Sequence, residues 1–487
     1  MRALSLPALL CGLLLCLPSA ASAAQNPVIT GDYPDLSAVR SGHTYYAVAT
    51  SKNWAPAFPV LRSSDLVNWR QISSVLPQPP RWATGGFWAP EISKWGRTFR
   101  VYYGARRAGG GPCIALATAR DPRGPWRDRG RVICNEQGAL DAYAVRDSRG
   151  LGWLVWKRRG LHQGIFIARL NRAGTDLTGR PVKLIEPQRP WEEATTEAPN
   201  LVRRDGWWYL IYSGGHCCRP PCTYQVGVAR SRSITGPYVR AARPALTHSE
   251  QLRCVGHGSL LRDVRGREWY LSHGYETSDV RNTRRQGILT PVTFDDGWPR
   301  FGDERHAPLT FSSPFGVAQR TAQATLTDGF SGGQLRAGWQ WHAEHPATAT
   351  VADGKLRLRG TIARLAPWRT YTASAKVRAR GGLHLIQFDE SVVGVTRTTD
   401  RTLRVWRGAA WPGRTLRTIN TASTRWLTVR AQITDGISAR FSVRVHGRWR
   451  HLGGPIRLGG RDNLRVALAS SSGFATIDRF TARADPS

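Results

Sequence analysis

A pattern that recurs five times along the first three-fifths of the chain limits the fold more than any other feature of the sequence. The recurring segments are DLSAVRSGHTYYAVATS from Asp35, WAPEISKWGRTFRVYYGA from Trp88, DAYAVRDSRGLGWLVWK from Asp141, EAPNLVRRDGWWYLIYS from Glu197, and HGSLLRDVRGREWYLSH from His257. Successive starts are 53, 53, 56 and 60 residues apart. In each segment an aliphatic residue stands four positions after the start, and a glycine and an aromatic stretch follow. This order is typical of a strand, a tight turn and a second strand.

Each recurring segment is followed by further strand-like stretches, so one unit holds about four short strands. The stretches are FPVLRSSDLVNW, CIALATARDPRGPW, GIFIARLNRAGTDLTG, YQVGVARSRSITGPY and RRQGILTPVTFDDGWP. Five units of four strands predict a five-bladed β-propeller. A β-sandwich would explain the alternation but not the repeat. The Gly, Thr, Val and aromatic content excludes a helical solenoid.

The repeat stops after the DDGWPRF turn, and a second pattern begins near Asp328. Stretches such as GKLRLRG, YTASAKVRAR, RWLTVRAQITDG and SARFSVRVHG alternate apolar and polar residues at fairly even spacing. They predict a β-sandwich of the jelly-roll type. We therefore expect an all-β chain with a propeller over residues 25–311, a linker over 312–325 and a sandwich over 326–487.

The first 23 residues have the pattern of a secretory signal peptide. Arg2 precedes a short apolar run, and Ala21 and Ala23 fit a cleavage site before Ala24. The run is short for a transmembrane helix, and no later stretch is long and apolar enough to span a bilayer. We expect a secreted, extracellular protein without a membrane span.

Six cysteines follow the signal peptide, and an even number in an exported chain favours disulfides. We expect Cys113 to pair with Cys134, because both lie in the second unit. At least one bond should tie the insert HCCRPPC to Cys254. Adjacent cysteines rarely bridge each other, so Cys217 and Cys218 are expected to have different partners. A metal site on this insert, with His216 as a further ligand, is the alternative.

The formal net charge of +35 suggests an acidic partner, but its distribution does not suggest nucleic acid. Only six of the 69 basic residues are lysines, and the arginines are spread along the whole chain without a dense block. No helix-turn-helix, zinc-finger or RNA-binding pattern accompanies them. Acidic polysaccharides fit such a surface better.

The first strand of each propeller blade lines the central channel, so the five segment starts should converge there. They supply three carboxylates, an indole and an imidazole. Hydrolysis of a glycosidic bond needs two carboxyl groups in opposite protonation states, and neighbouring like charges can keep one of them protonated. Apolar walls for a sugar face are expected from Trp54, Phe87 and Trp88. The alternative is that blade starts merely favour polar caps.

The motifs NPVITGDYPDLS, FWAPEI, GALDAYAVRD, TEAPNLVRRDGWWYLIYS, GHGSLL and RRQGILTPVTFDDGWP resemble glycoside hydrolase family 43, in the family's order. That family consists of five-bladed propellers that act with inversion of configuration. The resemblance implies that Asp35 is the general base, Glu197 the general acid, and Asp141 the group that tunes and orients the acid. It places a substrate-binding arginine at Arg285 and, at His257, a histidine beside a central calcium ion.

The resemblance also implies the substrate class, which is β-D-xylosyl or α-L-arabinofuranosyl groups on oligosaccharides from xylan, arabinoxylan or arabinan. The C-terminal domain resembles the concanavalin-like sandwich of xylosidase-type members, which favours an exo-acting enzyme. Leu36 stands where the family commonly has proline, and the cysteine-rich insert is atypical, so both leave the substrate open. An endo-arabinanase, a retaining fructan-active propeller and a non-catalytic carbohydrate-binding propeller remain alternatives. Asp32 is a weaker candidate for the base.

Overall fold

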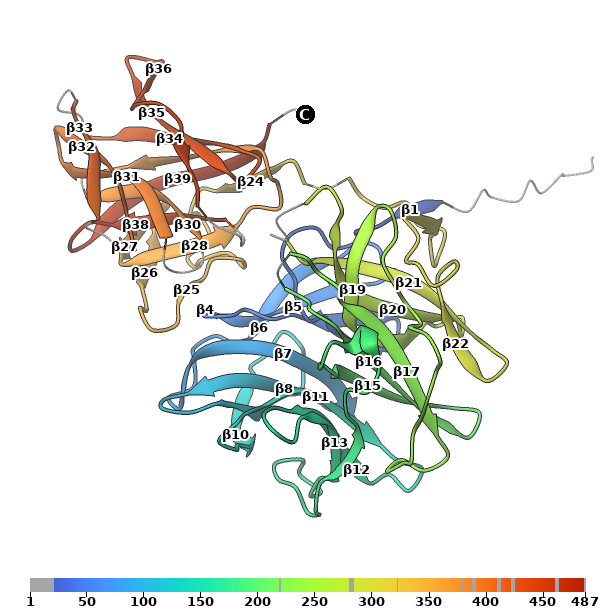
Figure 1. The fold of residues 1–487 in the computed structure, drawn as a ribbon. Coiled ribbons are helices and arrows are strands. Elements are labelled where there is room, and N and C mark those ends of the chain that lie inside the picture. Colours follow the sequence, from blue (N-terminus) through green and yellow to red (C-terminus); the bar gives the residue numbers. More distant parts are fainter. Residues whose placement is uncertain are drawn as a thin grey trace, which may run out of the picture.

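The computed structural model describes residues 22–485, apart from 219, 280–283, 322, 379, 388–390, 410–412, 422–424 and 460–463. All but the last two residues of the expected signal peptide, 1–23, lie outside the described part. The chain forms two β domains (Figure 1), a five-bladed propeller and a C-terminal sandwich, as the repeat and the alternation predicted. In the described part of the chain, no helix has the length and apolarity needed to cross a membrane.

Each propeller blade is an antiparallel sheet of four strands in sequence order, which is the arrangement that a strand–turn–strand repeat produces. The first blade contains β2 (Ser37–Ser41), β3 (Thr44–Val48), β5 (Ala57–Ser63) and β6 (Arg70–Leu76). The second contains β7 (Ala83–Trp95), β8 (Thr98–Arg107), β9 (Pro112–Ala119) and β10 (Arg127–Ile133). The third contains β11 (Ala139–Arg146), β12 (Gly152–Arg158), β13 (Gly164–Arg169) and β14 (Val182–Ile185).

The last two blades follow the same order. The fourth contains β15 (Glu197–Arg204), β16 (Trp207–Gly214), β17 (Gln225–Ser231) and β18 (Val239–Arg240), preceded by a short 3-10 helix, η1 (Pro190–Glu192). The fifth contains β19 (Leu252–Arg262), β20 (Glu268–Glu276), β21 (Gln286–Asp295) and β22 (Trp298–Phe301). The inner strands β2, β7, β11, β15 and β19 contact one another in a closed ring.

The two ends of the propeller are joined beside the fifth blade. β1 (Ala23–Gln25) pairs with β23 (Thr310–Ser312). The buried amide of Asn26 donates to the carbonyl oxygens of Leu289 and Pro308, at 2.9 and 2.8 Å, and accepts the Leu289 N–H at 2.8 Å. Because a buried amide that loses such partners costs roughly 1–3 kcal/mol, Asn26 holds this closure in one register.

The second domain is a sandwich of two antiparallel sheets. One sheet contains β24 (Thr325–Asp328), β26 (Thr348–Ala352), β27 (Lys355–Arg359), β29 (Tyr371–Val377), β34 (Leu427–Thr434), β35 (Ser438–Val445), β36 (Arg448–His451), β37 (Ile456–Arg457) and β39 (Ala475–Ala484). The other contains β28 (Thr361–Leu365), β30 (Gly381–Gln387), β31 (Ser391–Thr399), β32 (Thr402–Gly408), β33 (Arg414–Asn420) and β38 (Arg465–Ser470). Alternating residues such as Tyr371, Ala373 and Ala375 are buried, and they form one core with Leu383 and Phe480.

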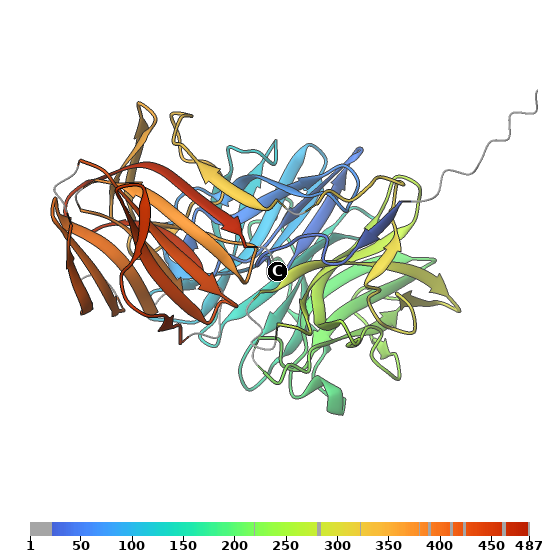
Figure 2. The same ribbon diagram turned by 90° about the horizontal axis from the view of Figure 1, so that it is seen from above.

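The sandwich lies beside the first propeller blade (Figure 2) and is joined to it by a small sheet. β4 (Trp54–Ala55) pairs with β25 (Trp341–His342). The Trp54 side chain is 3% exposed and packs with sandwich residues that include Ile386 and Trp406. The Arg465 guanidinium lies 4.3 Å from the centre of the Trp54 ring. Nearly the whole Trp54 side chain is therefore buried in the contact between the domains.

The disulfides agree with two expectations and contradict the third. Cys113 pairs with Cys134, and Cys222 of the insert pairs with Cys254, as expected. The expectation that Cys217 and Cys218 have different partners is wrong, because they are bonded to each other. Once the other four cysteines have paired across the fold, these two are left within reach only of each other. All six thiols are therefore used, and the insert has no thiolates for a metal site.

Candidate active site

A left-handed backbone residue stands at the channel end of every blade. These residues are Asp35 (φ 56°), Ala89 (45°), Asp141 (54°), Ala198 (53°) and His257 (44°). For residues other than glycine this conformation costs roughly 1–2 kcal/mol, and it is kept where the surroundings enforce it, often at functional sites. The structural repeat thus runs through Ala89 and Ala198. The sequence repeat aligned Trp88 and Glu197 with Asp35. In the structure, each of these two residues lies one position before the left-handed residue of its blade.

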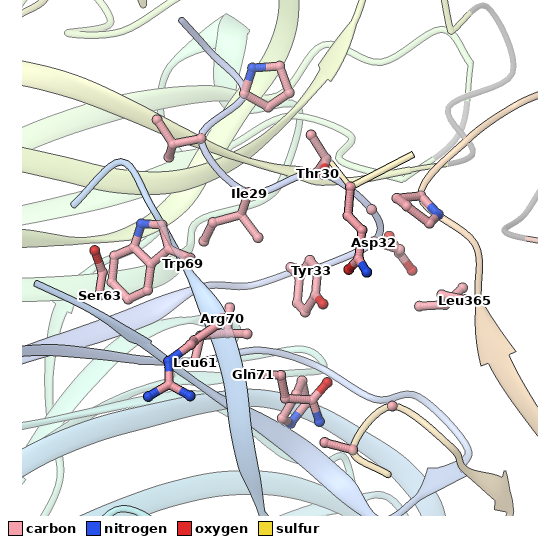
Figure 3. A pocket seen from close by; sticks show the side chains of 18 of the residues that line it. Ile29, Thr30, Asp32, Tyr33, Leu61, Ser63, Trp69, Arg70, Gln71 and Leu365 are labelled. Atoms are coloured by element: carbon pink, nitrogen blue, oxygen red, sulfur yellow. The ribbon is translucent and has the colours of Figure 1, made fainter. Parts of the chain in front are cut away.

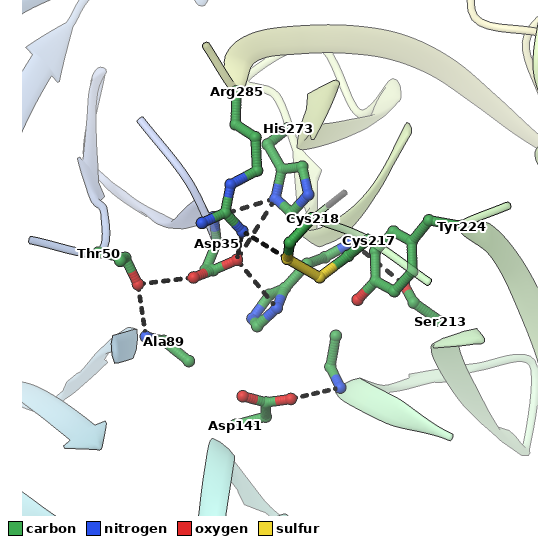
Figure 4. A network of polar contacts seen from close by, with 12 residues as sticks. Asp35, Thr50, Ala89, Asp141, Ser213, Cys217, Cys218, Tyr224, His273 and Arg285 are labelled. Atoms are coloured by element: carbon green, nitrogen blue, oxygen red, sulfur yellow. Dashed lines mark hydrogen bonds and ion pairs between the residues drawn. A yellow bond between two sulfur atoms is a disulfide. The ribbon is translucent and has the colours of Figure 1, made fainter. Parts of the chain in front are cut away.

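Side chains from neighbouring blades bind the backbone N–H groups of four of these residues (Figure 4). The donor–acceptor pairs are Ala89 N to Thr50 Oγ1 at 2.7 Å, Asp35 N to His273 Nδ1 at 3.0 Å, His257 N to Ser213 Oγ at 3.1 Å, and Ala198 N to Asp141 Oδ2 at 3.1 Å. These bonds link the blades around the channel. They also fix the backbone at the residues that carry the candidate catalytic groups.

The Asp35 carboxylate is surrounded by donors and positive charge. Thr50 Oγ1 donates to Oδ2 at 2.6 Å, and Arg285 Nη1 donates to Oδ1 at 2.9 Å. The Nδ1 atoms of His257 and His273 lie 3.6 and 3.5 Å from the same Oδ1. Burial alone would raise the pKa of Asp35, but Arg285, His257 and the Thr50 bond outweigh it and hold this pKa far below its usual range. Asp35 is therefore ionised and able to accept a proton.

Glu197 lies at the start of β15 and is also held from two sides. Lys157 Nζ on β12 donates to Oε2 at 2.5 Å, and the buried Tyr224 hydroxyl donates to Oε1 at 2.8 Å. Burial raises the pKa of Glu197, but the Lys157 charge and the two hydrogen bonds together bring it below its usual range. The high pKa expected of a general acid is not found while Lys157 stays in contact.

Asp141 acts on the backbone beside Glu197. Its Oδ2 accepts the N–H of Ala198, the residue that follows Glu197. Burial raises the pKa of Asp141, the His257 charge opposes this, and the ionised Glu197 raises the pKa further. The pKa of Asp141 is thus raised, whereas that of Glu197 is lowered.

The charged side chains of the site are exposed to solvent to a similar, small extent. The side chains of Arg285, Asp35, His257, Glu197 and Lys157 are 11, 12, 14, 15 and 16% exposed, respectively. Groups from four blades thus lie together at the channel end, and we call the space among them the recess.

The three aromatic residues that were predicted to contact the sugar differ in their burial. Trp54 is buried against the sandwich, and Phe87 is fully buried between the first and second blades, where its ring lies 5.9 Å from that of Phe58. Trp88 is half-buried, beside Gly86. Neither Trp54 nor Phe87 therefore offers an accessible face, whereas Arg285 does reach the recess.

Sequence reasoning missed Lys157, Tyr224, Thr50 and His273. A signal was available for two of them, because Lys157 and His273 end the aromatic second strand of the third and fifth repeats, as Ser213 does in the fourth. The strand register sets these residues opposite Leu140, Gly256 and Glu197 at the channel end of the inner strands. A polar residue at that point of an apolar strand is the pattern that predicts them.

A cavity of about 660 Å³ lies between the first blade and the sandwich (Figure 3). Tyr33, Trp69 and Arg364 are among the residues that line it, but the three candidate catalytic carboxylates are not. Asp32, the weaker candidate for the base, also lines it. Asp32 accepts the Arg285 N–H at 3.0 Å and pairs with Lys52 at 3.4 Å, so it holds two loops together.

Comparison with known proteins gives one family. The model of glycosyl hydrolases family 43 matches residues 24–299, which is more than half of the chain. The chain is 31% identical over 301 residues to "Xylosidase/arabinosidase 43B" of Humicola insolens, a match that covers 56% of this chain and 54% of the relative. It is 27% identical over 293 residues to "Extracellular endo-alpha-(1->5)-L-arabinanase 1" of Bacillus subtilis, covering 55% of this chain and 87% of the relative. The chain thus spans about half the length of some relatives that it matches.

Solved structures share the fold across both domains. BlXynB, a GH43 protein from Bacillus licheniformis, superposes with a TM-score of 0.80 at 22% identity, covering 95% of this chain and all of that one. The xylan beta-1,4-xylosidase from Bacillus Halodurans gives a TM-score of 0.78 at 24% identity, covering 94% of this chain and all of that one. At these identities the likeness supports the propeller and the sandwich as the shared architecture.

Proposed function

Because the chain belongs to glycosyl hydrolases family 43, we propose that it removes terminal β-D-xylosyl or α-L-arabinofuranosyl groups with inversion of configuration. One observation carries this proposal. Asp35 and Glu197 lie at the same end of the channel, but one is held ionised by Arg285 and the other is bound by Lys157 and Tyr224. Two carboxyl groups in different surroundings are what acid and base roles require.

In the proposed reaction Asp35 takes a proton from water, and the water oxygen attacks the anomeric carbon. Glu197 gives its proton to the leaving oxygen as the glycosidic bond breaks. A neutral sugar that fills the recess displaces water from Glu197, which raises its pKa, and the leaving oxygen competes with Lys157 for the carboxyl group. Asp141 holds the Ala198 backbone, so that Glu197 keeps its direction toward the sugar.

The proposed substrates are oligosaccharides derived from xylan, arabinoxylan or arabinan. Relatives carry the names xylosidase, arabinofuranosidase and arabinanase, which supports a pentosyl group as the unit removed. The C-terminal sandwich, which the structure of a xylan beta-1,4-xylosidase shares, supports exo action. Two relatives are named extracellular, which together with the N-terminal sequence supports secretion of this chain.

The calcium ion that the resemblance implied beside His257 remains a proposal. Within the described residues, no three or more His, Cys, Asp or Glu side chains are grouped so as to hold a metal ion. His257 Nδ1 is directed to Asp35, and Ca²⁺ prefers oxygen ligands. The ion would therefore be held through water, and metal analysis of the dialysed protein, with about one ion per chain expected, tests it.

The test is a panel of aryl glycosides and defined pentose oligosaccharides, with proton NMR of the first sugar released. We expect a free pentose whose anomeric configuration is opposite to that of the substrate. Retention would contradict the roles of Asp35 and Glu197, and would favour a retaining propeller. Internal cleavage of arabinan would favour an endo-arabinanase. Binding of these oligosaccharides without any cleavage would indicate a non-catalytic carbohydrate-binding propeller.

A further inference from the structure

The cysteine-rich insert between β16 and β17 is held at its two ends, beside the recess. His216 N donates to Thr223 Oγ1 at 3.0 Å and Thr223 N donates to His216 O at 3.1 Å, which closes the base of the loop. Cys222 is bonded to Cys254 at the buried side of β19. The loop is therefore fixed without any help from its second disulfide.

That second disulfide, Cys217–Cys218, spans the supports of both candidate catalytic carboxylates (Figure 4). Cys218 Sγ lies 3.8 Å from Arg285 Nη1, the atom that donates to Asp35. Cys217 packs on a small buried cluster that contains Tyr224, whose hydroxyl donates to Glu197. One end of the disulfide thus contacts the partner of the base, and the other end packs on the cluster that contains the partner of the acid.

A role in stability alone explains this bond poorly. In the chain-entropy account, a disulfide stabilises by closing a loop in the unfolded chain, and its effect grows with the length of that loop. Cys217 and Cys218 are adjacent, so their bond closes almost no loop. The Cys113–Cys134 bond spans 21 residues and is the one expected to stabilise the propeller.

The chemistry of a disulfide differs from that of the charged groups in the recess. It is uncharged, has no N–H or O–H to donate, and presents polarisable sulfur. Cys218 is exposed and Cys217 is partly buried, so the pair can be reached from solvent. The other groups described around the recess are mostly charged or hydrogen-bonding, while Trp54 and Phe87 are buried elsewhere. The C–H face of a sugar needs an apolar surface on which to pack.

We propose that the Cys217–Cys218 disulfide forms the apolar wall on which the terminal sugar packs, and that it keeps the Arg285 guanidinium on Asp35. This inference rests on the proposed function and names a specificity-determining element of the same site. A pair of separate side chains at these positions would leave both Arg285 and the bound sugar free to shift.

The test compares two double variants with the wild type in kcat, KM and the midpoint of thermal unfolding. For Cys217→Ser with Cys218→Ser we expect KM for an aryl pentoside to rise at least tenfold, kcat to fall less, and the unfolding midpoint to stay within a few degrees. Cys113→Ser with Cys134→Ser is the matched control, because it also removes one disulfide. It should lower the unfolding midpoint and leave KM unchanged.

The outcomes separate this inference from the proposed function. If the wild type cleaves pentosides and the Cys217/Cys218 variant keeps its KM, the wall is refuted while the proposed function stands. An equal rise of KM in both double variants would also refute it, because the effect would then come from general loosening. A wild type inactive on every pentoside would overturn the proposed function, and this inference with it. Titration of the Cys217/Cys218 variant with free xylose and arabinose should show weaker binding than in the wild type, and equal binding would again refute the wall.

Discussion

Replacing Lys157 by methionine tests how the surroundings of Glu197 set its protonation. Lys157 Nζ lies 2.5 Å from Glu197 Oε2, and the two side chains are only 16 and 15% exposed, so solvent screens the contact little. Methionine keeps most of the length and the apolar stem but removes the charge and the donor. The Tyr224 hydroxyl remains on the other carboxylate oxygen.

The direction and the size of the effect follow from this contact. Lys157 stabilises the ionised form of Glu197, so its removal raises the pKa of Glu197. A hydrogen bond to a charged group contributes about 1.5–3 kcal/mol. Since a tenfold change in protonation corresponds to about 1.4 kcal/mol, the basic limb of the pH–rate profile should move to higher pH by about 1 to 2 pH units.

The assay is kcat/KM against pH for wild type and Lys157→Met, on a pentoside with a poor leaving group. The basic limb of kcat/KM reports the proton on the acid of the free enzyme. Lys183→Met is the matched control, because Lys183 makes a similar contact to Glu186 at 2.6 Å on the outer part of the third blade. Its profile should equal that of the wild type. An unmoved basic limb in Lys157→Met would refute either the control of Glu197 by Lys157 or the role of Glu197 as the acid.

Three further changes test neighbouring parts of the structure. Glu197→Gln should lower kcat far more on natural pentosides than on activated aryl pentosides, because an activated leaving group departs without a proton. An equal loss of kcat on both would indicate a structural role. Asp141→Asn should keep much of kcat, because the amide oxygen can still accept the Ala198 N–H, whereas Asp141→Ala should lose far more; equal losses would mean that the charge of Asp141 matters instead. Trp54→Ala should lower the free energy of unfolding by about 3–5 kcal/mol, measured by denaturant titration, with little change in KM. A raised KM at unchanged stability would instead indicate that Trp54 contacts the sugar.

The repeat and the alternation were enough to predict the architecture, and the repeat also predicted that three carboxylates lie at one end of the channel. Five evenly spaced strand–turn–strand segments can bury their apolar faces only against neighbours of the same kind, which closes them into a ring. Because every inner strand then points its first residues into one channel, Asp35, Asp141 and Glu197 had to meet. The alternation after Asp328 likewise left a two-sheet sandwich as the way to cover one apolar face of each sheet.

The side to which each residue at a strand end points could not be predicted, because it depends on packing between blades and between domains. Phe87 and Trp54 look like a sugar platform in the sequence, but the neighbouring blade and the sandwich cover them. In the fourth blade the left-handed position is occupied by Ala198, so Glu197 lies one residue before the position that Asp35 and Asp141 occupy. A shift of one residue cannot be detected from the repeat pattern alone. Lys157 reaches Glu197 from a strand of another blade, 40 residues away in sequence. Spacing along a chain fixes which elements form, whereas contacts between blades depend on side-chain packing across the ring, which no local pattern records.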